Sequence, residues 1–358
     1  MSEIFEHYSK LSYNYIFSSW TGDNTAEWEH LQIAAPMLLS LNIAGLPFVG
    51  ADVGGFFGNP DENLLIRWNQ AGAYQPFFRG HAHHDSKRRE PWVFGEEVLQ
   101  ILRKATMARY ALIPYWYTVF WWASITGMPI MRPMWMEFPT VSDVFDLDDQ
   151  YLIGSDLLIK PVTSNGQTET EIILPQSSLW YDVDTLDRME SSTSNASLKI
   201  KVQTPLDKIP VFQRGGSIIS RKVRLRRSVP LMFFDPYTLY IALDSNNQAS
   251  GILYSDDENT FSYETGHYIV SNFSADFKTT QTLTNIITSG SAKEMNWMDD
   301  ERIGVIERIV IMGLSRAPSK VLSKEQVLTF DYIPDKMVLV IKKPKVSALE
   351  DWDISFQF

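Results

Sequence analysis

The sequence predicts an α/β segment with parallel strands, followed by a longer region of β-sandwiches. In the first third of the chain, short apolar runs alternate three times with helical patterns, and such strand-then-helix units place their strands in parallel. After about Met128, short β-rich segments are separated by Gly, Asn, Asp and Pro, which is typical of β-sandwiches. At 358 residues the chain is long enough for two or three domains.

The first unit is a predicted strand over residues 15–20 followed by a helix. Asn24 and Glu27 have the spacing of a helix N-cap and its capping glutamate, and apolar residues then recur at helical intervals from Trp28 onward. Because Asn24 fills the cap position, Asp23 is left to point out of the strand end. We therefore treat Asp23 as a candidate catalytic residue. A purely structural role at the helix start is the alternative.

The second unit begins with an apolar run over 43–49 that ends at Asp52, and its helix begins near residues 59–62. Glycines flank Asp52, so a ligand could approach the backbone closely there. The alternative is a loop aspartate that bonds its own backbone. The glycines do not form a G-x-G-x-x-G pattern, which excludes a dinucleotide site of that type.

The third unit has a predicted strand over 75–79, which ends at His81, and a long helix from about Glu96 to Ile125. In parallel α/β folds the chemistry gathers at the C-terminal ends of the strands. Asp23, Asp52 and His81 occupy three equivalent positions of this kind. This repetition is the strongest functional signal in the residues themselves.

His81, His83, His84 and Asp85 form the one histidine cluster of the sequence. A metal site would need a further ligand and a compatible geometry, so a hydrogen bond from one histidine to a substrate, or a structural role, is favoured.

Three other segments invite a functional interpretation. Residues 111–131 carry no charge, but Pro114 and Pro129 favour a buried, aromatic-rich helix ending near Gly127 over a membrane span. Residues 256–259 are acidic but lack the spacing of a calcium loop, so we predict a solvated hairpin turn. The basic stretch 221–227 is predicted to be a strand with a solvated face, near a boundary between two sandwiches.

Composition narrows the function further. The net charge of −11 argues against nucleic acid and anionic membrane surfaces as partners. The absence of cysteine excludes disulfides and Cys-based metal sites. Asn195 and Asn272 lie in N-x-S triplets and are candidate glycosylation sites. Aromatic residues make up 13% of the chain, which suits sugar stacking and ordinary cores alike.

Four stretches, residues 20–28, 50–56, 72–92 and 209–216, resemble the family 31 glycoside hydrolases, and the resemblance extends from about residue 18 to the end. It implies that residues 1–127 are the last three units of a (β/α)8 barrel. It also implies a proximal β-sandwich over 128–222 and a distal β-sandwich over 223–358.

The resemblance further implies a retaining α-glucosidase without a metal or organic cofactor, in which Asp23 is the catalytic acid/base. The substrate-binding residues that it implies are Trp20, Asp52, Phe56, Arg79 and His81. Asp52 and His81 would contact the sugar, Phe56 would line the neighbouring subsite, and Trp20 and Arg79 would form the site wall.

Within this family, the chain is most similar to members that remove glucose from N-linked glycans in the endoplasmic reticulum lumen. These members are retained there by a separate β subunit. The family's nucleophile motif, W-x-D-M-N-E, does not occur in this sequence. We therefore expect a fragment that is inactive alone. The alternatives are a non-catalytic carbohydrate-binding or regulatory fragment, and an α-xylosidase or transglycosidase with different subsites.

Overall fold

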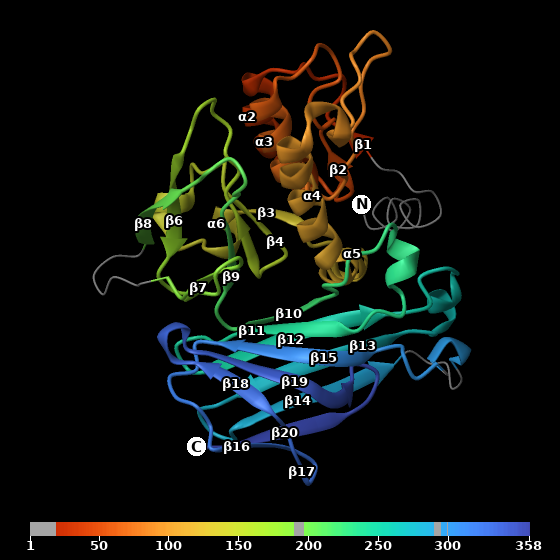
Figure 1. Ribbon diagram of the computed structural model, residues 1–358, viewed down its shortest axis with the longest axis vertical. Helices are drawn as coiled ribbons and strands as arrows, with labels where there is room; N and C mark the ends of the chain where they lie inside the picture. The colour runs from red at the N-terminus through yellow and green to blue at the C-terminus, as the bar shows by residue number, and fades with distance from the viewer. Residues whose placement is uncertain (1–18, 190–196, 290–294, 299) are drawn as a thin grey trace. The chain divides into compact units, whose positions relative to one another are not determined.

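The computed structural model describes residues 19–189, 197–289, 295–298 and 300–358 (Figure 1). These residues divide into two compact units, which are described separately. The first takes its described residues from Met1–Arg109, Val119–Leu174 and Lys199–Pro210. The second takes them from Tyr110–Thr118, Pro175–Leu198 and Val211–Phe358.

The first unit begins with two strand-then-helix pairs. The strands are β1 (Ser19–Trp20) and β2 (Val49–Gly50), and the helices are α2 (Trp28–Ile43) and α3 (Glu62–Gly72). The two strands pair in parallel, with Trp20 opposite Gly50. The parallel pairing that the sequence predicted for the first two strands is therefore confirmed.

The third strand was predicted over residues 75–79. This segment lies beside β2, as expected, but it is not a regular strand. The segment forms no regular strand, because Pro76 has no N–H to donate to a ladder. Two backbone bonds nevertheless align it with β2: the Phe77 N–H donates to Val49 O at 3.0 Å, and the Val53 N–H donates to Arg79 O at 3.0 Å.

The helices of the first unit pack through small apolar clusters (Figure 1). Leu31 of α2 meets Leu64 and Trp68 of α3 in one buried cluster. Leu65 of α3 meets Leu102 of α4 (Glu96–Ala111) in another. Burial of this apolar surface holds the helices behind the short strands.

The predicted long helix over 96–125 is two helices, α4 and α5 (Ile113–Thr126). The break falls at Leu112, because the ring of Pro114 and its missing N–H prevent a continuous helix. Gly127 follows α5 with a φ of 74°, a left-handed conformation that suits glycine and ends a helix. Among the described residues, no helix is long and apolar enough to cross a membrane.

The rest of the first unit adds short antiparallel strands. They are β3 (Met131–Pro133), β4 (Tyr151–Ile153) and β5 (Leu157–Ile159), with α6 (Met134–Glu137), η1 (Pro91–Phe94) and η2 (Ser142–Val144) between elements. A separate two-stranded sheet joins β6 (Glu169–Pro175) and β8 (Ser197–Gln203). The buried Asn42 Oδ1 accepts from the N–H groups of Ile130 and Met131, which ties α2 to β3.

The second unit is built on one large mixed sheet, with eleven strands in the described part of the chain. Their spatial order is β17-β16-β20-β14-β13-β12-β10-β11-β15-β19-β18. The bounds are β10 Ser217–Arg221, β11 Tyr237–Ala242, β12 Gln248–Ser255, β13 Ile269–Asp276, β14 Thr282–Ser289, β15 Val305–Met312, β16 Lys320–Ser323, β17 Gln326–Val327, β18 Phe330–Ile333, β19 Val338–Ser347 and β20 Trp352–Gln357. Four short 3-10 helices connect them, η3 Val229–Met232, η4 Ser262–Thr265, η5 Asn296–Met298 and η6 Pro334–Lys336. The short strands β7 (Trp180–Asp182) and β9 (Val211–Arg214) pair antiparallel.

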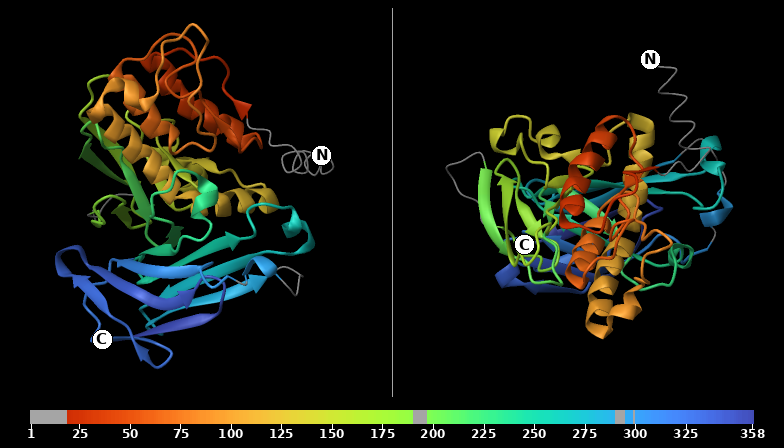
Figure 2. Two further views of the ribbon diagram at one scale, coloured as in Figure 1. Left: turned by 45° about the vertical axis from the view of Figure 1, so that its right-hand side comes forward. Right: turned by 90° about the horizontal axis from the view of Figure 1, so that it is seen from above.

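This sheet curls on itself (Figure 2) and encloses an apolar core. Val321 and Ile354 come from strands near one end of the order, and Leu339 and Ile341 from near the other, yet all four belong to the same buried cluster. Phe273 from the middle of the sheet is 2% exposed and lies in that cluster too. The β-rich segments expected from the sequence contribute these strands.

The basic stretch 221–227 is not a strand with a solvated face. Strand β10 ends at Arg221, and Lys222 is buried with its ammonium group donating to the carbonyls of Met232 and Phe233. Arg226 forms an ion pair with Asp235 at 2.5 Å. Two of the basic side chains of this stretch are therefore paired with protein groups rather than with water alone.

The prediction of a solvated turn at 256–259 is wrong for Asp256. Its side chain is 4% exposed and accepts from the hydroxyls of Tyr117, at 2.8 and 2.9 Å, and Tyr254, at 2.9 Å. The acidic run gave no sign that Tyr117, distant in sequence, would bind its first carboxylate together with the nearby Tyr254.

Of the two candidate glycosylation sites, Asn195 lies outside the described residues. Asn272 lies on β13, where its side-chain amide donates to Ile286 O at 3.0 Å and to Thr288 Oγ1 at 2.9 Å. Its glycosylation stays a prediction.

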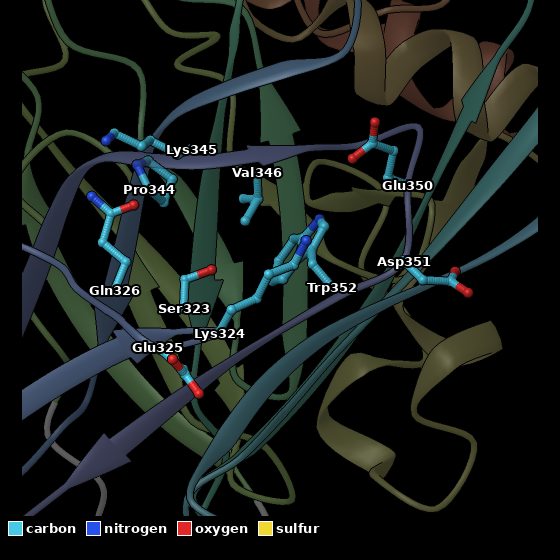
Figure 3. A pocket seen from close by; sticks show the side chains of 10 residues that line it. All are labelled: Ser323, Lys324, Glu325, Gln326, Pro344, Lys345, Val346, Glu350, Asp351 and Trp352. Atoms are coloured by element: carbon cyan, nitrogen blue, oxygen red, sulfur yellow. The ribbon is translucent and has the colours of Figure 1, made fainter.

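A pocket of about 320 Å³ opens on the second unit (Figure 3). Residues of the β16–β17 turn, of the stretch 344–346 and of the stretch 350–352 line it, and Trp352 lies at the centre of the view. None of the site residues expected from the sequence lines this pocket.

Candidate functional site

The loops that carry the candidate residues leave from adjacent ends of three aligned segments. Beyond the β1–β2 pair, the Thr21 N–H donates to Gly50 O at 3.1 Å. On the other side, Phe77 approaches so closely that a Cβ on Gly50 would lie 1.9 Å from Phe77 O. Glycine is therefore required at position 50, and this close approach brings the third segment beside β2.

Asn24 joins two of these loops and is not a helix cap. Helix α2 begins at Trp28, and its N-cap residue is Glu27. The Asn24 side chain is buried; its Oδ1 accepts from the Phe56 N–H at 2.8 Å, and its Nδ2 donates to Asp52 O at 3.1 Å. The capping prediction failed because a side-chain amide can satisfy a distant backbone as well as the next helical turn.

Asp52 is the buried carboxylate of the site, with 1% exposure. Its Oδ1 accepts from Arg79 Nη2 at 2.7 Å and from Arg79 Nε at 3.1 Å. Its Oδ2 is also buried but has no hydrogen-bond partner among the described residues. A buried, unpaired carboxylate oxygen is costly, so this atom is a strong acceptor for a donor group of a ligand.

Arg79 connects Asp52 to an aromatic surface. Its guanidinium carbon lies 4.9 Å from the centre of the Trp20 ring and 5.2 Å from that of Phe77. Trp20 is 43% exposed, so part of its ring faces solvent at this end of the strands. The structure thus brings Trp20, Arg79 and Asp52 into one contact group.

Phe56 and His81 form a second contact group. Their ring centroids are 5.3 Å apart, with an interplanar angle of 35°. Phe56 is half-buried and His81 is exposed. Phe56 follows Asp52 on the same loop, and its N–H, which donates to Asn24 Oδ1, links this group to the loop of Asn24.

Asp23 lies on the loop between the Trp20 strand and the Asn24 bridge. Its side chain is exposed, and among the described residues its carboxylate has no hydrogen-bond or ion-pair partner. Gly22, with a φ of 86°, permits the turn that precedes it. The site therefore combines an accessible carboxylate at Asp23 with a buried, arginine-bound carboxylate at Asp52.

Arg89 is a positioning residue that the sequence analysis did not single out. Its guanidinium donates to the carbonyls of Gly54, Gly55 and Gly58, at 2.5 to 3.0 Å. Burial lowers the Arg89 pKa, while the negative charge of Asp52 acts in the opposite direction. The signal was present in the sequence: a glycine-rich loop leaves carbonyls that a nearby arginine, with five donors, is suited to bind.

Comparison with known proteins places this site in a family. Residues 12–119 match the glycosyl hydrolases family 31 TIM-barrel domain, and residues 127–219 match the glycosyl hydrolase family 31 C-terminal domain. Together these matches span more than half of the chain. The chain belongs to glycosyl hydrolase family 31. The fold class expected from the sequence, part of a barrel followed by β domains, is confirmed.

Relatives within family 31 are named as α-glucosidases. The chain is 48% identical over 341 residues to neutral alpha-glucosidase AB of Dictyostelium discoideum, covering 94% of this chain and 35% of that protein. A glucosidase II alpha subunit structure, alpha3-Glc2-bound, superimposes with a TM-score of 0.87 at 41% identity, covering 94% of this chain and 37% of that one. A structure of the ER glucosidase II heterodimeric complex contains a catalytic subunit and the binding domain of a regulatory subunit. It superimposes with a TM-score of 0.86 at 40% sequence identity, covering 94% of this chain and 37% of that one. This chain thus spans about a third of the length of these family 31 relatives.

Proposed function

We propose that this chain supplies the acid/base half of a retaining α-glucosidase active site, with Asp23 as the catalytic acid/base. The observation that carries the proposal is the contrast between two carboxylates at neighbouring strand ends. One, Asp23, is accessible and unpaired among the described residues; the other, Asp52, is buried and bound by Arg79. Different environments are how two carboxylates take different roles in glycoside hydrolysis.

In this proposal Asp52 binds the sugar rather than reacting with it. A sugar hydroxyl donates to the buried Oδ2, while Arg79 holds Oδ1 in place. His81 contacts the same sugar from the next loop, and Phe56 lines the neighbouring subsite. Trp20 and Arg79 form the wall, where an exposed indole offers an apolar face to a sugar ring.

The retaining mechanism needs a second carboxylate about 5 Å from the acid/base, and this carboxylate forms a covalent glycosyl-enzyme. Asp52 is poorly suited to that role because Arg79 holds one oxygen and burial restricts the other. We place the nucleophile outside these 358 residues. The chain alone is therefore proposed to be inactive as a hydrolase.

The relatives support a more specific substrate, partner and compartment. Their names describe glucosidase II, bound in one structure to an α3-linked glucose disaccharide and in another to a regulatory subunit. We propose a terminal α-linked glucose of an N-glycan as the substrate, a glucosidase II β subunit as the partner, and the endoplasmic reticulum lumen as the location.

The domain boundaries are part of the proposal. We propose that the barrel part ends at residue 127, that a proximal β-sandwich follows over 128–222, and that a distal one covers 223–358. Limited proteolysis should cut near residues 127 and 222 before it cuts within β11 to β15 if these boundaries are right.

The proposed function is tested by aryl α-glucoside hydrolysis in the protein that carries this chain together with its nucleophile. Asp52→Asn should lower kcat/KM by about tenfold to more than a hundredfold, the value of a hydrogen bond to a charged group. Asp61→Asn is the matched control, because Asp61 caps α3 through Leu64 N–H and asparagine caps equally well.

Two results would contradict this function. One is an Asp52→Asn variant as active as the Asp61→Asn control. The other is binding of a glucosyl oligosaccharide without turnover and unchanged by Asp23→Asn, which would support the non-catalytic carbohydrate-binding alternative.

A further inference from the structure

Three side chains that the proposed function does not use lie together on the loop after His81. His83 Nδ1 is 3.5 Å from Asp85 Oδ2, and His84 Nε2 is 3.3 Å from Asp85 Oδ1. The ligand atoms of all three residues lie within 4.8 Å of one another. We propose that His83, His84 and Asp85 form a binding site for one divalent transition-metal ion of the zinc type.

The spacing of these atoms suits such an ion. Zinc binds imidazole nitrogen and carboxylate oxygen at about 2.0–2.2 Å, so the ligand atoms of a tetrahedral site lie roughly 3.3–3.5 Å apart. The two imidazoles lie 3.5 and 3.3 Å from different oxygens of Asp85, Oδ2 and Oδ1. With one oxygen as the ligand, the three ligand atoms lie within 4.8 Å of one another, so rotation of the exposed side chains closes them on one ion. Two imidazoles and one carboxylate favour zinc, copper or nickel over magnesium or calcium, which prefer oxygen ligands alone.

The hydrogen bonds place a lone pair where the metal needs it. The Asp85 N–H donates to His83 Nδ1 at 3.3 Å, so in this arrangement Nδ1 is an unprotonated ring nitrogen and offers a lone pair. A metal ion binds that form of imidazole. The bond that the ion would replace is long and exposed, so its loss costs little.

The turn that carries the three ligands is anchored on both sides. The His83 N–H donates to Phe56 O at 2.9 Å, and the Ser86 N–H closes the turn on His83 O at 2.9 Å. The Lys87 N–H then donates to Asn59 Oδ1 at 2.7 Å. The backbone of the turn is therefore already in place, which lowers the entropy cost of binding.

The site is also open to an arriving ion. The side chains of His84 and Asp85 are 81% and 79% exposed, while that of His83 is 30% exposed. An incoming ion therefore reaches the ligands directly, and water completes its coordination. The structure thus adds to the histidine cluster of the sequence the proximity of its three ligand atoms. The proposal does not depend on the glucosidase function.

Isothermal titration of the 358-residue chain with zinc chloride tests the site. We expect one zinc ion per chain, and a loss of affinity of about tenfold or more in each of His84→Leu and Asp85→Asn. His267→Gln is the matched control, because it removes a histidine outside the cluster and should leave the affinity unchanged.

Absence of a one-to-one zinc complex with the unmodified chain would overturn the proposal. So would zinc affinity that His84→Leu and Asp85→Asn leave unchanged, or that His267→Gln lowers equally. Circular dichroism shows whether each variant folds, and either of the two ligand variants suffices for the decision. Cobalt substitution provides an independent measurement: the visible bands of four-coordinate cobalt should appear with the unmodified chain and disappear with His84→Leu.

Discussion

The loops of the candidate site and the curled sheet of the second unit are held by different kinds of interaction. In the first unit, β1 and β2 are two residues long, and side chains such as Asn24 and Arg89 bind the backbone of neighbouring loops. In the second unit, strands of up to ten residues pair in register around a shared apolar core. The sheet spreads its stability over many contacts, whereas the site depends on a few polar ones whose removal acts locally.

The largest expected effect on stability lies in the sheet. Phe273→Ala should lower the free energy of unfolding by about 3–5 kcal/mol, because it empties a fully buried position in the core. Urea denaturation measures this change. The exposed Val327→Ala should change stability by no more than about 0.5 kcal/mol. Equal effects of the two substitutions would mean that the core is not organised around Phe273.

A substitution in the backbone of the site should have a smaller but more local effect. Gly50→Ala should cost about 1–3 kcal/mol, because the new methyl group overlaps Phe77 O and must displace the third segment. Hydrogen exchange should rise at the amides of Thr21 and Phe77. Gly80→Ala, where open space surrounds the new methyl group, is the control. Exchange that rises equally in both variants would remove the argument for close approach.

The two side-chain hydrogen bonds of Asn24 should contribute about 1–3 kcal/mol to the free energy of unfolding. Asn24→Ala leaves the Asp52 carbonyl without its Nδ2 donor. It also removes one of the two acceptors of the Phe56 N–H, Asn24 Oδ1, and leaves the other, Asn24 O. Exchange of the Phe56 amide should increase while the amides of β13 stay protected. Loss of protection across both units would show that the bridge is not a local element.

The smallest effect is expected at an exposed ion pair. Lys104→Ala should change stability by about 0.2–1 kcal/mol, because Lys104 and Asp207 are both half exposed and water screens the pair. The Lys104 hydrogen bond lowers the pKa of Asp207, so the contribution is present at neutral pH and is lost as the pH falls through that lowered pKa. Lys104→Arg should preserve it, and thermal unfolding across the acid range measures both.

The same contrast explains how much could be predicted from sequence. Apolar periodicity and turn residues gave the first two strand–helix units and the β-rich region, because local patterns determine them. The break between α4 and α5 at Leu112 was not predicted, although Pro114 indicates a helix boundary there. The contacts of Asn24 with Phe56 and of Asp256 with Tyr117 could not be predicted, because they join residues far apart in the chain and leave no periodic pattern.

For the site, the sequence placed Asp23, Asp52 and His81 at strand ends, and the structure aligns those ends. It did not reveal that Arg79 binds one oxygen of Asp52 and leaves the other unpaired. That asymmetry arises from tertiary packing. It separates the proposed sugar-binding carboxylate from the proposed acid/base.

The most direct test of this account is the leaving-group dependence of Asp23→Asn in the protein that carries this chain. A general acid matters most when the departing oxygen is strongly basic, so the variant should cleave a glucose disaccharide about 10²- to 10⁴-fold more slowly. The first step with a dinitrophenyl α-glucoside, whose leaving oxygen needs no proton, should slow far less. An equal loss with both substrates, or no loss with either, would contradict the assignment of Asp23 as the acid/base.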